Sequence, residues 1–203
     1  MRVLLLSVLA SAGLVCGAGL PRTTGAPVTV ILDFEKPHSE VSLEAMRQQV
    51  QRLLGEAGVR VDFRLRRDLP AHAGFADLVL FKMRGSCSMQ TWSPGIPDRN
   101  ERAPLAMTYS ENGQLLHFGE VACDRVRESL QRVLGPANGR KYESALGNAL
   151  GLVVAHEMYH MLADTKAHTK QGVTKEALSA RELLDGNLSL PQVARQAMRT
   201  PGP

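Results

Sequence analysis

Hydrophobic and polar residues follow two different periods along this chain, and each change of period marks the border of a predicted element. The mostly apolar residues 28–34 predict a strand, and residues 78–83 predict another, more buried one. Residues 59–66 alternate strictly, which predicts a strand with one solvated face. Between these segments, apolar residues recur at helical spacing from 39 to 54 and predict an amphipathic helix.

Two further strands are predicted at residues 105–109 and 115–121. They flank Asn112-Gly113, a dipeptide typical of tight β-hairpins. Before this hairpin lies a long stretch without a pattern, residues 84–102, which contains several glycines and prolines. A stretch of this length is either a functional rim over a cleft or a tolerated surface insertion, and the sequence leaves both interpretations open.

Helices dominate the rest of the chain. Asp124 can cap a helix that runs to Leu134, and the apolar spacing over residues 140–163 predicts a long helix. Residues 164–203 show no strong pattern beyond a short helix near 191–198. The order of these elements predicts an α+β fold, in which a mixed β-sheet packs on helices.

The predicted long helix ends in the motif His156-Glu157-Met158-Tyr159-His160, which reads H-E-x-x-H. Residues four apart lie on one face of a helix, so both imidazoles can reach one tetrahedral Zn²⁺. The carboxylate of Glu157 would lie beside the metal, where it can take a proton from water. The helix stripe that ends in this motif faces the core, because it contains Val153, Ala149, Leu146 and Tyr142. The alternative interpretation is a helix end that carries two ordinary histidines.

A catalytic zinc site needs a third protein ligand, and His168 is the first candidate. It is the only histidine after the motif, and it lies just past the predicted helix end, where a turn can bring it back to the metal. Asp164 is a second candidate, because it continues the helical face of His160, but it could instead orient an imidazole or end the helix. Glu182, 22 residues after His160, and Glu176 remain further alternatives.

These residues give the chain a resemblance to the zincin superfamily of H-E-x-x-H metallopeptidases, and within it to metzincins, as an outlying, secreted, bacterial-type protein. The motif resemblance covers Val153–His168. It implies a twisted mixed sheet above a long active-site helix, followed by a turn that delivers a third histidine. It also implies one catalytic Zn²⁺ ion held by His156, His160 and His168, with Glu157 as the general base.

The chain departs from the metzincin pattern after the motif. The metzincin sequence H-E-x-x-H-x-x-G-x-x-H would place a glycine at position 163 and a histidine at position 166, where this chain has Ala163 and Lys166. The Met-turn of metzincins has no nearby counterpart, because Met198 is the only methionine after His168.

Two functions follow as expectations. The first is a secreted zinc metallopeptidase that hydrolyses peptide or protein substrates by means of a zinc-activated water, with Glu157 as the general base. The substrate would lie extended along an exposed sheet edge, for which we expect the hairpin region 104–121. The second is a catalytically inactive zincin-fold module that binds zinc and interacts with partners. The short chain, the absent Met-turn and the shifted position of His168 motivate this alternative.

The beginning of the chain indicates export. Residues 1–18 combine a basic residue, an apolar run and small residues, which predicts a signal peptide. Residues 19–27 would form a flexible lead, and residues 28–203 a single catalytic domain in the periplasm or outside the cell. In such a compartment Cys87 and Cys123 are expected to form a disulfide, while the alternative is that one thiolate binds the metal.

Composition excludes some classes of partner. The net charge of +4 comes from basic residues mixed with acidic ones, and aromatic residues make up only 4% of the chain, so nucleic-acid binding is not expected. No stretch reaches the roughly 18 apolar residues of a spanning helix, so no stable membrane insertion is expected. A lipid anchor at Cys16 would need a small residue before it, where the chain has Val15. We expect a monomer.

Overall fold

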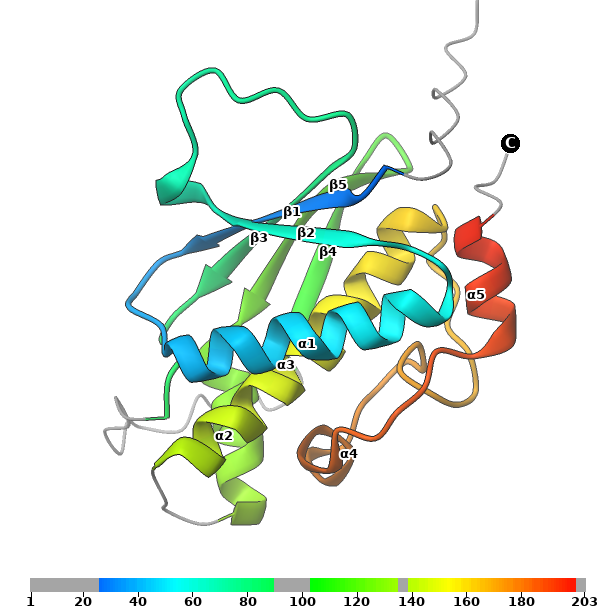
Figure 1. Ribbon diagram of the computed structural model, residues 1–203. Helices are drawn as coiled ribbons and strands as arrows, with labels where there is room; N and C mark the ends of the chain where they lie inside the picture. Colours follow the sequence, from blue (N-terminus) through cyan, green and yellow to red (C-terminus); the bar gives the residue numbers. More distant parts are fainter. Residues whose placement is uncertain (1–25, 90–102, 135–138, 200–203) are drawn as a thin grey trace, which may run out of the picture.

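The computed structural model describes residues 26–89, 103–134 and 139–199, and these segments contain a sheet with the strand order β2-β1-β3-β5-β4 (Figure 1). The strands are β1 (Val28–Phe34), β2 (Val61–Leu65), β3 (Leu78–Arg84), β4 (Ala106–Glu111) and β5 (Gln114–Ala122). The pairs β2–β1, β1–β3 and β3–β5 are parallel, and β4 runs antiparallel to β5. The predicted α+β class with a mixed sheet is therefore confirmed.

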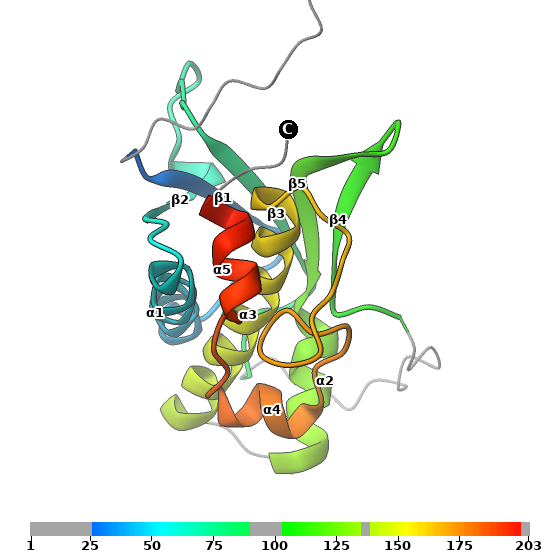
Figure 2. The ribbon, with the colours of Figure 1, turned by 90° about the vertical axis from the view of Figure 1, so that its right-hand side faces the viewer.

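The helices lie under one face of this sheet (Figures 1 and 2). They are α1 (Glu40–Glu56), α2 (Cys123–Leu134), α3 (Arg140–Leu162), α4 (Ala180–Asp185) and α5 (Gln192–Arg199), and a short 3₁₀ turn spans Arg66–Asp68. Side chains from both layers form the core between sheet and helices. Its fully buried members include Val30, Phe81 and Val121 from strands and Val50, Leu146 and Val154 from helices.

Helix α3 packs closely against α1 because two of its residues lack side chains. A Cβ atom at Gly151 would lie 2.6 Å from the Cβ of Gln49, and one at Gly147 would overlap the carbonyl oxygen of Ser42. Any larger residue at either position would push the two helices apart. The close contact fixes α3 beneath the sheet, and this helix carries the H-E-x-x-H motif.

The segment that follows β3 is fastened to the helices. Cys87 forms a disulfide with Cys123 at the start of α2, as predicted, so neither sulfur is available as a metal ligand. The buried carboxylate of Glu143 accepts hydrogen bonds from the Ser88 hydroxyl at 2.8 Å and from the Met89 backbone at 2.9 Å. These bonds join the segment to the first turn of α3.

The hairpin between β4 and β5 turns at Asn112-Gly113, as predicted. Both residues have positive φ angles, 50° for Asn112 and 86° for Gly113, which is the combination that a type I′ hairpin turn requires. Strand β4 consequently forms the outer edge of the sheet next to α3.

Two predictions about the helices need correction. Helix α2 begins at Cys123, before the predicted cap Asp124, whose carboxylate instead accepts a hydrogen bond from Ser86 N at 3.2 Å. Residues 164–203 contain α4 in addition to the predicted short helix. Its start was readable in the sequence, because Ser179 and Glu182 have the S-x-x-E spacing of a capping box and form one.

Some predictions fall outside the described residues. The predicted signal peptide, residues 1–18, lies there, as does most of the predicted lead, residues 19–27. Within the described part of the chain, none of the helices has the length and apolar character needed to cross a bilayer.

Candidate metal centre

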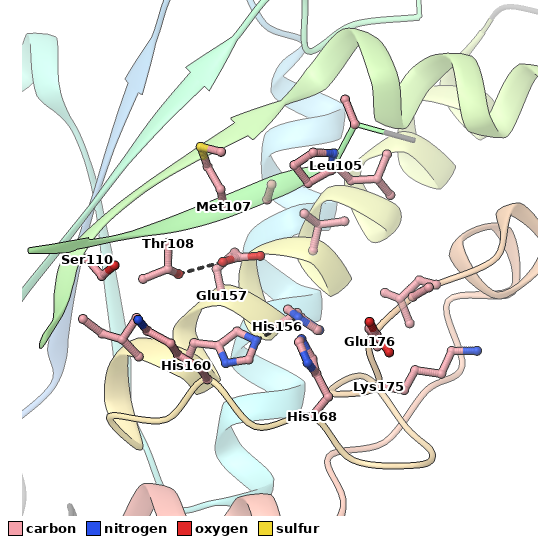
Figure 3. A pocket seen from close by; sticks show the side chains of 18 residues that line it. Leu105, Met107, Thr108, Ser110, His156, Glu157, His160, His168, Lys175 and Glu176 are labelled. Atoms are coloured by element: carbon pink, nitrogen blue, oxygen red, sulfur yellow. Dashed lines mark hydrogen bonds between the residues drawn. The ribbon is translucent and has the colours of Figure 1, made fainter. Parts of the chain in front are cut away.

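Three histidines converge at the end of α3 (Figure 3). His156 and His160 lie one turn apart on the helix, and His168 comes from the segment that follows it. One ring nitrogen from each of the three lies within 4.8 Å of the others. The structure therefore brings together the three residues expected to bind a metal, and together they could hold an ion.

Backbone carbonyl groups orient two of these imidazoles. His156 Nδ1 lies 2.9 Å from the carbonyl oxygen of Val173, and His160 Nδ1 lies 2.7 Å from that of Thr165. A carbonyl oxygen only accepts hydrogen bonds, so each Nδ1 carries the proton and each neutral ring keeps its lone pair on Nε2. This is the arrangement by which outer partners fix the tautomer of metal-binding histidines.

The two Nε2 atoms face each other. His156 Nε2 lies 3.0 Å from His160 Nε2, and the lone pairs of two neutral rings repel each other at this distance. A shared cation removes the repulsion. Burial lowers the pKa of both histidines, which keeps them neutral and therefore able to bind a metal. The donor set thus fits a metal ion with a preference for imidazole nitrogen.

The chain leaves α3 through a turn that depends on Asp164. This residue has a φ of 44°, in the left-handed region, and the backbone N–H of Thr165 donates to the carbonyl oxygen of His160 at 3.1 Å. The turn aims the carbonyl of Thr165 at the His160 ring. Asp164 therefore ends the helix, and its carboxylate is not part of the histidine cluster.

The two glutamates considered as ligands have different positions. Glu182 is held in the α4 capping box and pairs with Lys175, 2.5 Å from Nζ. These bonds lower its pKa to about 2, with the Lys175 hydrogen bond as the largest cause. Glu176 is exposed and lines the cavity that also contains the histidines. Neither glutamate belongs to the histidine cluster.

A short loop after α3, closed by hydrogen bonds between Thr169 and Thr174, supports the histidine cluster. The Thr169 backbone N–H donates to the carbonyl oxygen of Thr174 at 3.0 Å, and their hydroxyl oxygens are 2.7 Å apart. Val173 and Thr174 are fully buried, and the Val173 backbone N–H donates to Ser189 at 3.0 Å. The loop therefore places His168, which immediately precedes it, and also the carbonyl that orients His156.

Glu157 faces a cavity of about 580 Å³ that opens above the histidines. One wall of the cavity is the cleft-facing side of β4, with Ala106, Thr108 and Ser110, and the opposite wall is formed by residues 175–178. Glu157 is only 7% exposed, and its Oε2 accepts a hydrogen bond of 2.6 Å from the Thr108 hydroxyl (Figure 3).

The protonation of Glu157 reflects its surroundings. Burial raises the pKa of this carboxyl group, while the hydrogen bond from Thr108 and the nearby histidines His160 and His168 lower it to a smaller extent. A carboxylate with a raised pKa beside a candidate metal site is suited to accept and return a proton.

The sequence did not reveal three residues that shape this site. Thr165 and Val173 act through backbone carbonyls, which every residue possesses, so no side-chain signal marks them. Thr108 contacts Glu157 across 49 residues of sequence.

Comparison with protein-family models, with curated proteins and with solved structures finds no match to this chain.

Proposed function

We propose that this protein is a zincin-like, zinc-dependent metallopeptidase that acts outside the cytosol. The observation that carries the proposal is the convergence of His156, His160 and His168 beside Glu157, in a cavity bordered by a sheet edge. Three imidazoles with one position left open are the ligand set of several catalytic zinc sites. When bound there, Zn²⁺ would polarise the scissile carbonyl group and lower the pKa of a water molecule.

The protein's own residues supply the remaining steps. Glu157 accepts a proton from the attacking water and later returns it to the leaving amine of the product. The buried position of this carboxylate favours such a role, since burial raises its pKa. The carbonyl groups of Val173 and Thr165 keep two ligand rings in the tautomer that presents Nε2 to the metal.

The expected substrate is an extended peptide. Strand β4 is an edge strand of the sheet, and three of its four cavity-lining residues, Ala106, Thr108 and Ser110, are small. A peptide can add to such an edge through main-chain hydrogen bonds, which would place its scissile bond over the histidines. The disulfide between Cys87 and Cys123 supports a location in an oxidising compartment.

Metal content and turnover test this proposal. The purified protein is expected to contain one zinc per chain, and His168→Ala is expected to lose most of it. Wild-type protein should cleave members of a mixed peptide library, whereas Glu157→Gln should keep its zinc and lose nearly all cleavage. Full zinc without any cleavage by the wild type would favour the inactive zinc-binding module, and wild-type-like cleavage by Glu157→Gln would refute the role of this residue.

A further inference from the structure

The hydrogen bond between Thr108 and Glu157 connects the edge strand directly to the proposed general base. The Thr108 Oγ1 atom lies 2.6 Å from Glu157 Oε2 (Figure 3). The threonine hydroxyl is the donor of this bond, and the carboxylate oxygen is its acceptor. The bond is short and partly buried, which is typical of a strong, charge-assisted interaction.

The backbone around Thr108 fixes its position. Thr108 pairs with Gly119 on β5, and the register between the two strands shifts immediately afterwards, before Ser110. A Cβ atom at Gly119 would lie 2.9 Å from both the Met107 carbonyl oxygen and the Met161 Cε atom. Glycine at this position therefore lets the hairpin lie close to α3. The threonine hydroxyl reaches Glu157 because of this close approach, and irregular pairing of this kind often redirects side chains next to active sites.

We propose that Thr108 is a positioning residue for Glu157. Its hydroxyl binds one carboxylate oxygen and so holds the carboxylate in the orientation that proton transfer needs. This inference rests on the proposed peptidase function. It gives a residue of the expected substrate-binding strand a role in orienting the general base.

The physical reason lies in the freedom of a glutamate side chain. The terminal torsion of glutamate is broad, so an unrestrained carboxylate samples many orientations. A strong bond to Oε2 narrows this range before a substrate arrives, and proton transfer requires reacting atoms within hydrogen-bond reach. Because Thr108 lies on the strand that would carry the substrate, the same backbone positions both the peptide and the base.

Three variants separate this role from a general effect on folding. Thr108→Val keeps the β-branched shape and removes the hydroxyl, while Thr108→Ser keeps the hydroxyl. Tyr109→Phe is the matched control, because it removes a hydroxyl from the next residue, which stacks on Phe118 and does not line the cavity. Zinc content and the thermal unfolding midpoint are measured for each protein before any other comparison.

Turnover provides the first readout. With a peptide that the wild type cleaves, Thr108→Val should lower kcat by about tenfold or more, while KM changes by less than about twofold. Thr108→Ser should restore kcat to within about threefold of wild type, and Tyr109→Phe should leave both constants unchanged.

A second readout does not depend on cleavage. Acetohydroxamic acid chelates a metal ion through its carbonyl and N–O oxygens and gives up its N–OH proton to a neighbouring carboxylate. Its affinity for the Co²⁺-loaded proteins can be followed by visible absorption. We expect about tenfold weaker binding by Thr108→Val, and nearly normal binding by Thr108→Ser and Tyr109→Phe.

The outcomes distinguish the two proposals. If the loaded wild type cleaves no peptide but Thr108→Val binds acetohydroxamate more weakly, the peptidase function fails and the positioning role stands. If Thr108→Val matches the wild type in kcat and in acetohydroxamate affinity, the positioning role is wrong and the peptidase function is untouched. A wild type that binds no metal overturns both.

Discussion

The Nδ1 atom of His156 lies 2.9 Å from the carbonyl oxygen of Val173, which is 17 residues further along the chain. This contact joins the end of α3 to the loop formed by Thr169 and Thr174. The same loop begins directly after His168, so one short segment positions two of the three histidines. Metal affinity should therefore depend on bonds that lie outside the histidines themselves.

The first prediction concerns Thr174, whose side chain is fully buried. The Thr169 hydroxyl donates its single hydrogen to the carbonyl oxygen of Gln171, so Thr174 must be the donor in the bond between the two hydroxyl groups. Thr174→Val removes that donor while preserving the side-chain shape. The loss of this partly buried hydrogen bond, worth about 0.5–1.5 kcal/mol, should weaken zinc binding by up to about tenfold.

Competition with a chelator of known affinity measures this effect. Thr174→Ser serves as the control, since it keeps the hydroxyl and should retain most of the affinity. Equal zinc affinity in wild type and Thr174→Val would mean that the loop does not help to organise the site.

The second prediction separates two roles of Asp164. Its left-handed backbone, with a φ of 44°, costs an ordinary L-residue roughly 1–2 kcal/mol, and glycine adopts it freely. Asp164→Gly should therefore unfold at the same or a higher urea concentration than wild type. Asp164→Val should lose about 1–2 kcal/mol of stability. Zinc content should stay near one per chain in Asp164→Gly, and loss of zinc without loss of stability would instead identify Asp164 as a ligand.

The sequence predicted those parts of the site that depend on local spacing. His156, Glu157 and His160 follow from helix geometry alone, because residues one turn apart share a face. His168 was identified because it is the only histidine after the motif. A turn after the helix was expected, but its geometry could not be predicted, since Asp164 adopts the left-handed conformation without being a glycine.

The contacts made by the rest of the site depend on tertiary packing. The position of Thr108 depends on the register between β4 and β5 and on how closely the hairpin approaches α3. Neither property can be read from the alternation of polar and apolar residues, which sets only the face of a strand. The order of strands in the sheet is likewise a non-local property, although the class of fold followed from the order of elements along the chain.

The third prediction concerns pH and Glu182. Hydrogen bonds from Lys175 and Ser179 lower the pKa of this carboxyl group to about 2 in the folded protein, below the value of about 4.5 for a free glutamate. A lowered pKa in the folded state contributes stability that is fully present above about pH 4.5 and is lost as the pH falls toward 2. Because the pair is partly exposed, solvent screening limits this contribution to about 1 kcal/mol at most.

Urea unfolding of wild type and Glu182→Gln at a series of pH values tests this. Glutamine can still complete the capping box, so the difference between the two proteins reports the ionised pair. The stability difference should be constant between pH 5 and 7 and should shrink steadily toward pH 2. A difference that does not change with pH would show that the charge of Glu182 contributes nothing to folding.

The fourth prediction concerns the disulfide between Cys87 and Cys123, which are 36 residues apart in the sequence. Cross-links of this kind typically stabilise a protein by about 2–4 kcal/mol, so the double substitution Cys87→Ala and Cys123→Ala should lower the free energy of unfolding by about this amount. Zinc content should not change under native conditions, because neither sulfur belongs to the histidine cluster. Urea unfolding and zinc analysis of the variant, with reduced wild type as the control, measure both effects. Loss of zinc from a variant that remains folded would show that the disulfide, which fixes the first residue of α2, also helps to hold the metal site in place.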